Sequence, residues 1–70
     1  MDAGLTIEEF ARQTGVPLED GPYETVAGYV MHRLGRLAEV GDTVDVDGHR
    51  LVVTDVDRHR ITRVSVRPGA

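Results

Sequence analysis

The hydrophobic pattern of the chain changes its period once, at Gly41-Asp42. Before this point, apolar residues recur at the spacing of amphipathic helices. After it, they alternate with polar residues, as in half-buried strands. A chain of 70 residues forms one small domain at most, so both parts must share one core. The pattern therefore predicts an α+β fold in which the helices come first and the strands follow.

The first helix is expected directly after Thr6. Thr6 and Glu9 have the spacing of a capping box, and Leu5 with Phe10 that of a hydrophobic staple. Gly15 and the following Val16-Pro17 are expected to end the helix. Its predicted inward face consists of Ile7, Phe10 and Ala11.

The second helix is expected to begin after Thr25, whose hydroxyl can cap free amides, and to end at Gly35. Gly28 lies inside it, where glycine costs about 1 kcal/mol relative to alanine. We therefore expect another part of the backbone to approach Gly28 closely. The predicted inward face consists of Val26, Ala27, Val30, Met31, Leu34 and Leu37.

Three strands are predicted, over 43–46, 49–56 and 61–67. Asp47-Gly48 favours a type I′ hairpin turn between the first two, and 57–60 forms the second turn. The spacing of Ile61 from Val64 breaks the alternation, which indicates a bulge. The result is an antiparallel meander packed on two helices, in two layers. The residues expected to be buried together are Phe10, Val26, Val30, Leu34, Val53 and Val64.

The composition excludes several classes of protein. The chain has no cysteine, so neither a disulfide framework nor a thiolate metal site is available. Its formal net charge is −4, which argues against nucleic acid as a partner. The longest apolar run, 26–31, is far shorter than the roughly 20 residues of a membrane span. The sequence thus predicts a water-soluble piece.

No residue set has the pattern of a catalytic or metal site. The acidic residues around the hairpin lack the first carboxylate and the final glutamate of a calcium-binding loop. They are interpreted as turn and edge carboxylates: Asp42, Asp45, Asp47, Asp55 and Asp57. His32, His49 and His59 match no compact ligand motif and are expected on the surface. Ser65, the only serine, has no elbow motif around it.

One local cluster of basic residues lies on the last turn and strand: Arg58, Arg60, Arg63 and Arg67. Alternation along the strand would align Arg63, Ser65 and Arg67 on one face. The cluster is interpreted either as a solvated face that pairs with the aspartates or as a docking surface for an anionic partner.

Taken in order, several short motifs resemble those of the CorC/HlyC transporter-associated domain. They are Y-x-T-x-A-G (23–28), R-L-G-R (33–36), V-G-D (40–42), the D-G hairpin and the closing R-I-x-x-V-x-V (60–66). The segment 3–18 is also similar to the first helix of the family. On this resemblance, the positions that mark the fold are Thr25, Gly28, Gly35, Gly41, Asp42 and Gly48.

The resemblance implies more than this chain contains. Family members place a membrane domain and a pair of CBS domains before this domain, so the chain is expected to be the C-terminal piece of a longer protein. The family also has an opening strand, of which 1–4 would be the tail. The fold is similar to a subdomain of flavin enzymes, and this analogy alone suggests flavin adenine dinucleotide as a ligand.

The function predicted from the resemblance is that of a non-catalytic accessory domain. It would belong to a magnesium and cobalt efflux protein or to a hemolysin-like membrane protein. It would modulate ion transport, on the cytoplasmic side of the membrane, by docking to the CBS pair, the membrane domain or a sister copy in a weak homodimer. The alternative is a flavin- or nucleotide-binding module. A hydrolase, the third interpretation, would need a nucleophile–base pair that the sequence does not display.

Overall fold

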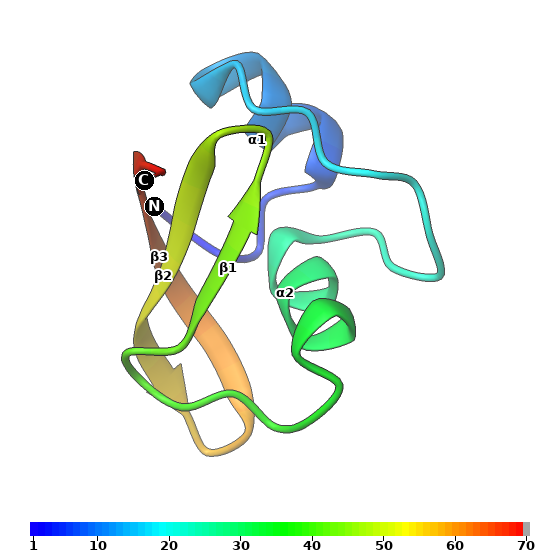
Figure 1. The fold of residues 1–70 in the computed structure, drawn as a ribbon. Coiled ribbons are helices and arrows are strands. Elements are labelled where there is room, and N and C mark those ends of the chain that lie inside the picture. Colours follow the sequence, from blue (N-terminus) through cyan, green and yellow to red (C-terminus); the bar gives the residue numbers. More distant parts are fainter. Residues whose placement is uncertain (70) are drawn as a thin grey trace.

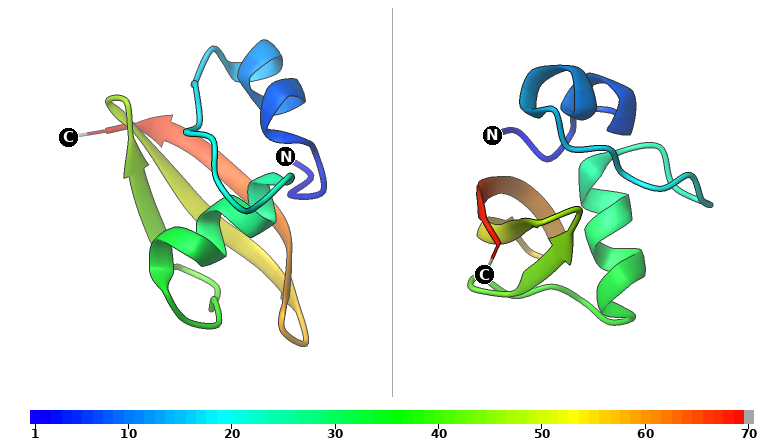
Figure 2. Two further views of the ribbon diagram at one scale, coloured as in Figure 1. Left: turned by 90° about the vertical axis from the view of Figure 1, so that its right-hand side faces the viewer. Right: turned by 45° about the horizontal axis from the view of Figure 1, so that its top comes forward.

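The computed structural model describes residues 1–69 and consists of two helices and a three-stranded antiparallel sheet (Figure 1). The helices are α1 (Ile7–Thr14) and α2 (Val26–Leu34), and the strands are β1 (Thr43–Val46), β2 (His49–Asp57) and β3 (Arg60–Pro68). The strand order is β1-β2-β3. Helix α2 packs against β1 and β3, and α1 packs against α2 (Figure 2). The predicted fold class is confirmed.

Local capping fixes both helices where the sequence predicts them. The Thr6 hydroxyl accepts from the Glu9 amide, and the Glu9 carboxylate accepts from the Thr6 amide, so the capping box is complete. The Thr25 hydroxyl accepts from the Gly28 amide at 3.2 Å and caps α2. Gly35 then ends α2 with φ +69°, a left-handed conformation that costs glycine little.

The sheet follows the predicted meander with one irregular region. Asp47 and Gly48 both have positive φ, as the predicted type I′ turn requires, and Val46 pairs with His49 beside it. The predicted break in alternation lies between β2 and β3, where the register shifts on both sides of Asp55. This shift allows Ile61 to be buried as well as Val64, although they are three residues apart.

The N-terminal segment pairs with the free edge of β3. The Val64 amide donates to the Met1 carbonyl at 2.9 Å, and the Ala3 amide donates to the Thr62 carbonyl at 3.0 Å. An antiparallel bridge joins Asp2 to Arg63 between these bonds. On its other side, the segment accepts hydrogen bonds from α2: the Ala3 carbonyl accepts from the Ala27 amide at 2.9 Å. The predicted tail of an opening strand is therefore an ordered part of the domain.

The core lies between α2, α1 and the inner face of the sheet. Of the six residues expected to be buried together, five are buried, but Leu34 is only partly buried. Leu37 was assigned to the inward face of α2, and this assignment is wrong. The helix ends at Leu34 and the chain turns at Gly35, so the Leu37 side chain is 54% exposed. Tyr29 and Ala3, which the sequence patterns did not select, are completely buried.

Candidate docking surface

The four arginines of the predicted docking surface do not form one cluster. All four are exposed, and β3 or its preceding turn carries each of them. Arg58 and Arg60 line one hollow next to α2, and Arg60 and Arg63 line the hollow that adjoins it. Arg67 lies farther along β3, where it pairs with Arg50 of β2 in the register of the sheet. The register is regular from Val64 to Pro68 but shifts between Val64 and Arg63, so the alignment of Arg63 with Ser65 and Arg67 stays a prediction.

A groove runs between α2 and the free edge of β3. Its lining includes the apolar residues Ala27, Met31 and Ile61. It also includes three arginines and three aspartates: Arg58, Arg60, Arg63, Asp2, Asp55 and Asp57. It has two adjoining parts of about 630 and 680 Å³, which share Ala27, Arg60 and Ile61. We refer to it as the α2–β3 groove.

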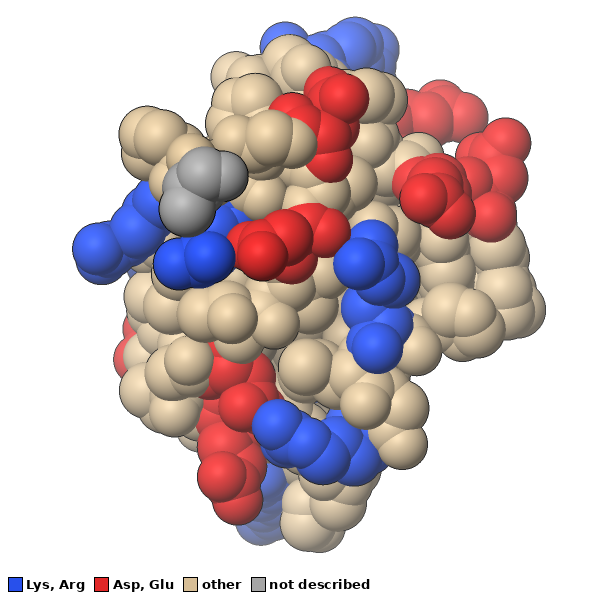
Figure 3. Space-filling model, in the orientation of Figure 1, with Lys and Arg blue, Asp and Glu red and all other residues tan. Residues whose placement is uncertain are grey.

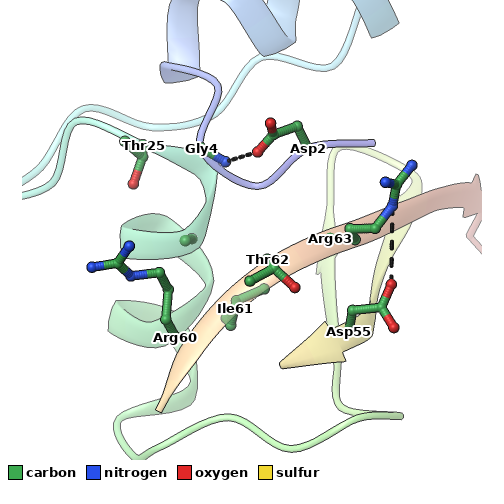
Figure 4. Close-up of a pocket in the computed structure, with 9 residues that line it drawn as sticks. Asp2, Gly4, Thr25, Asp55, Arg60, Ile61, Thr62 and Arg63 are labelled. Atoms are coloured by element: carbon green, nitrogen blue, oxygen red, sulfur yellow. Dashed lines mark hydrogen bonds and ion pairs between the residues drawn. The ribbon is translucent and has the colours of Figure 1, made fainter. Parts of the chain in front are cut away.

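The close-up in Figure 4 shows how charged side chains surround one part of this groove. Arg60 lies on the α2 side of β3, whereas Arg63 turns to the opposite side, toward Asp55. The Arg63 Nε and Asp55 Oδ2 atoms are 3.9 Å apart and both side chains are more than half exposed, so this ion pair is weak. Asp2 uses its Oδ1 to accept from the Gly4 amide at 2.7 Å. Within residues 1–69, Arg58 and Arg60 have no ion-pair partner.

Two of the sequence motifs meet in space through an ion pair that the sequence analysis did not predict. Arg36 donates to both carboxylate oxygens of Asp42, at 2.8 and 2.9 Å, and Asp42 also accepts from the Glu39 amide at 2.8 Å. The pKa of the Asp42 carboxyl lies below its usual range because it accepts hydrogen bonds, first from the Arg36 guanidinium and to a smaller extent from the Glu39 amide. The pair closes the turn between α2 and β1 and leaves Leu37 and Val40 exposed.

The other arginine of R-L-G-R also has a structural partner. Arg33 donates to the Tyr29 hydroxyl at 2.7 Å and to the Asp45 carbonyl at 3.1 Å, and it thus joins α2 to β1. Its guanidinium carbon lies 5.8 Å from the centroid of the Tyr29 ring. This contact satisfies the hydroxyl of a completely buried tyrosine. The four-residue spacing of Tyr29 and Arg33 is the signal by which the buried tyrosine could have been found.

The Y-x-T-x-A-G motif is a set of contacts around the start of α2. A Cβ atom added at Gly28 would lie 3.0 Å from the Cβ of Tyr23 and 3.9 Å from its Cα, so a side-chain atom makes the close approach that was expected of the backbone. The Tyr23 ring packs edge-on against Tyr29, with ring centroids 5.2 Å apart, and its hydroxyl donates to the Glu19 carbonyl. Burial, and next the neighbouring Tyr29, raises the pKa of Tyr23.

The acidic residues around the sheet are mostly engaged by arginines. Asp45 accepts from the Arg50 Nε at 2.9 Å, and this hydrogen bond lowers the pKa of Asp45. Asp42 and Asp55 pair with Arg36 and Arg63 as described above. Among residues 1–69, no group of three or more histidine or acidic side chains is arranged to hold a metal ion. His32 and His59 are exposed as expected, whereas His49 is half-buried.

The charge on the face shown in Figure 3 is mixed, with acidic side chains gathered over the loop between α1 and α2. This loop carries the exposed Glu19, Asp20 and Glu24. None of the helices within residues 1–69 has the length and hydropathy needed to cross a lipid bilayer.

Comparison with known proteins identifies the domain to which this arrangement belongs. The model of the CorC_HlyC family, described as a transporter associated domain, matches residues 1–70. The magnesium and cobalt efflux protein CorC of Salmonella typhimurium is 37% identical over 62 residues, which are 89% of this chain and 21% of that protein. CorC of Escherichia coli K12 is 36% identical over the same shares. The chain thus spans about a fifth of the length of these relatives.

Solved structures share the fold over almost the whole chain. The CorC_HlyC domain of Nitrosomonas europaea matches with a TM-score of 0.88 and 27% identity, over 97% of this chain and 82% of that one. The CorC_HlyC domain of a Xylella fastidiosa Temecula1 hemolysin, in complex with Mg²⁺ and Mn²⁺, matches with a TM-score of 0.87 and 30% identity, over 100% and 85%. The sequence match and the shared architecture lead to one conclusion: the chain belongs to the CorC_HlyC family of transporter associated domains.

Proposed function

We propose that this chain is a non-catalytic accessory domain of a magnesium and cobalt efflux protein, and that it modulates transport by docking to neighbouring domains. The family match and the CorC relatives support the transporter context. In this proposal the domain lies on the cytoplasmic side of the membrane and contacts the CBS pair, the membrane domain or a second copy. The Arg36–Asp42 and Arg33–Tyr29 contacts give the motif residues structural roles, so no chemical step is required of them.

The observation that carries the proposal is the groove between α2 and β3 with two exposed arginines beside it. Arg58 and Arg60 border the α2–β3 groove and have no acidic partner within residues 1–69. Because exposed arginines are well solvated, these two side chains add little to the stability of the folded domain. These charges would, however, orient a docking partner that carries acidic side chains and would raise its rate of association.

The proposal can be tested by exchange of domains in a relative. The segment of Escherichia coli CorC that matches this chain is replaced by residues 1–70, and the rate of cobalt efflux from loaded cells is measured. We expect efflux to change when the segment is removed, to be restored by residues 1–70, and to be impaired again by Arg60→Glu. Arg12→Glu, with the same charge change on α1 outside the groove, should behave like the unaltered chimera.

Equal efflux with and without the domain would contradict the accessory function. The alternative from the sequence analysis, binding of flavin adenine dinucleotide, is checked on the purified chain. A saturable change in flavin absorbance on addition of the chain would favour a ligand-binding module over a docking domain.

A further inference from the structure

We propose that the outer face of the sheet binds a second copy of this chain, face to face, about a two-fold axis that runs along β2. The inference rests on the proposed docking function and specifies one partner and the surface that contacts it. It uses residues outside the α2–β3 groove, so it is tested separately from the groove. Its basis is the charge pattern of this face, which is complementary to itself.

The outer face of the sheet lies opposite the core. Successive side chains of a strand point to opposite faces. The inner face, on which α2 packs, carries the buried residues of the three strands: Val44, Val46, Leu51, Val53, Ile61 and Val64. The outer face consists of two rows that cross the strands in register: Asp45, Arg50 and Arg67 in the first row, and Thr43, Val52 and Ser65 in the second. All six residues are exposed or half-buried, so a partner can reach them.

The first row leaves a positive charge on β3 without a counter-charge. Arg67 lies directly opposite Arg50 of β2, and like charges in this position are unfavourable. Arg50 is already engaged, because its Nε donates to the Asp45 Oδ1 at 2.9 Å. Within residues 1–69, Arg67 forms no ion pair. A carboxylate from another molecule would therefore be favourable beside Arg67.

Asp45 of a second copy can supply this carboxylate. Its side chain is 66% exposed, and only its Oδ1 accepts a hydrogen bond from a residue in 1–69. A carboxylate has room for several donors, so it can bind a second arginine. Rotation about an axis along β2 places β1 of one copy over β3 of the other, and each Asp45 then meets Arg67 of the other copy. An axis across the strands through this row would instead place Arg67 over Arg67.

The same rotation gives favourable partners to the second row. Val52, the apolar residue at its centre, would pack on Val52 of the other copy. Thr43 would face Ser65 of the other copy, and two hydroxyls can donate to and accept from each other. Each Arg50 leans toward its own Asp45, so the two guanidinium groups lie on opposite sides of the axis. The result is an aligned packing of two sheets with an isologous contact, as in most homodimers.

The small size of the contact sets its strength. Six residues from each copy are far fewer than the roughly 20–30 residues a side of a stable interface. We therefore expect a dissociation constant in the millimolar range for the free chain. The contact becomes significant when two copies are held close together, because the local concentration of the partner is then high.

The inference is tested by mixing two variants with opposite charge changes. The ¹⁵N-labelled chain of 70 residues is studied from micromolar to millimolar concentration by its amide signals and its translational diffusion. We expect signals of the two rows to shift, and diffusion to slow, as the concentration rises. Asp45→Arg and Arg67→Asp should each weaken self-association at least roughly tenfold. An equimolar mixture of the two should associate like the wild type, because each variant supplies the charge that the other lacks.

Matched controls carry the same charge changes outside the outer face. Asp20→Arg, in the loop before α2, and Arg12→Asp, on α1, are both exposed and should associate like the wild type. The amide spectrum of each variant shows whether it is folded, and recovery in the mixture excludes a folding defect as the cause of weak association.

Constant diffusion and constant amide signals up to millimolar concentration would overturn the inference. So would a mixture that associates as weakly as either variant alone, or shifts centred on Ala27 and Met31 of the groove. If the chain stays monomeric while efflux of the chimera still depends on Arg60, the inference fails and the docking function stands. If the mixture recovers association while efflux is equal with and without the domain, the contact stands and the accessory function fails.

Discussion

At the scale of single residues, the motif residues make the contacts that connect one element to the next. Gly28 lies under Tyr23, and Thr25 caps the same helix. Arg36 and Asp42 connect the end of α2 to the start of β1. The caps and turns could be predicted from sequence because they depend on neighbouring residues. The Arg36–Asp42 contact could not, because it depends on how the chain turns after Gly35.

Gly28→Ala is expected to destabilise the domain, although alanine is the better helix former. The added Cβ atom would meet the Tyr23 Cβ at 3.0 Å, and Tyr23 is held by Tyr29 and by the Glu19 carbonyl. We expect a net loss on the order of 1 kcal/mol, because crowding outweighs the gain in helix propensity. Urea unfolding followed by circular dichroism measures this. A variant more stable than the wild type would show that Tyr23 moves freely.

Asp42→Asn is expected to weaken the pH dependence of stability. The pKa of Asp42 is lowered in the folded chain by Arg36, so the folded state binds this proton less well than the unfolded state. Stability from the pair is therefore complete above the unfolded pKa of about 3.9 and is lost as the pH falls through the lowered pKa. Asp42→Asn should be less stable at neutral pH and lose less on acidification. Thermal melts at a series of pH values test this. Parallel curves for the two proteins would contradict the role of the pair.

At the scale of elements, the helices and the hairpin follow from local sequence, but their relations do not. The predicted strand 43–46 has exact bounds, and the other two strands are each slightly longer than predicted. Leu37 was misplaced because helical spacing was extended past Gly35, where the helix ends. The pairing of Met1–Ala3 with β3 joins residues about 60 positions apart, and no local sequence pattern indicates such a contact.

The N-terminal segment is expected to contribute to stability like a strand. Ala3→Pro removes the amide that donates to the Thr62 carbonyl and should cost about 2–3 kcal/mol. Asp2→Pro is the control, since no backbone hydrogen bond among residues 1–69 uses the Asp2 amide, and it is compared with Asp2→Ala, which also loses the bond from the Gly4 amide to the Asp2 carboxylate. It should be much milder. Chemical unfolding and hydrogen exchange at Val64 and Ala27 provide the measurement. Equal effects of the two prolines would mean that the segment is dispensable.

At the scale of the whole molecule, most aspartates around the sheet pair with arginines. Three of the five aspartates around the sheet face arginines, and one of the others, Asp47, occupies the hairpin turn. The related domain from Xylella fastidiosa is described in complex with Mg²⁺ and Mn²⁺, so binding of these two ions should be measured for this chain. The absence of a preformed metal site in this chain remains a prediction.

Titration of the chain with magnesium or manganese in a calorimeter is expected to give only weak heats that salt suppresses. Magnesium retains several of its waters and needs well-placed carboxylates, and those of Asp42 and Asp45 are already engaged by arginines. Calcium serves as a control ion. A stoichiometric site with micromolar affinity would contradict this prediction and favour direct sensing of ions by the domain.

The central claim, that the domain docks through the α2–β3 groove, is tested most directly by observing the contact itself. The ¹⁵N-labelled chain is mixed with Escherichia coli CorC that lacks its matching segment, and amide signals are followed as the partner is added. We predict selective loss of signal at Ile61 and the adjoining residues of β3 and α2, much reduced by Arg60→Glu and unchanged by Arg12→Glu. A uniform spectrum throughout the titration, or signal loss centred on the acidic loop at Glu19 and Asp20, would contradict the account.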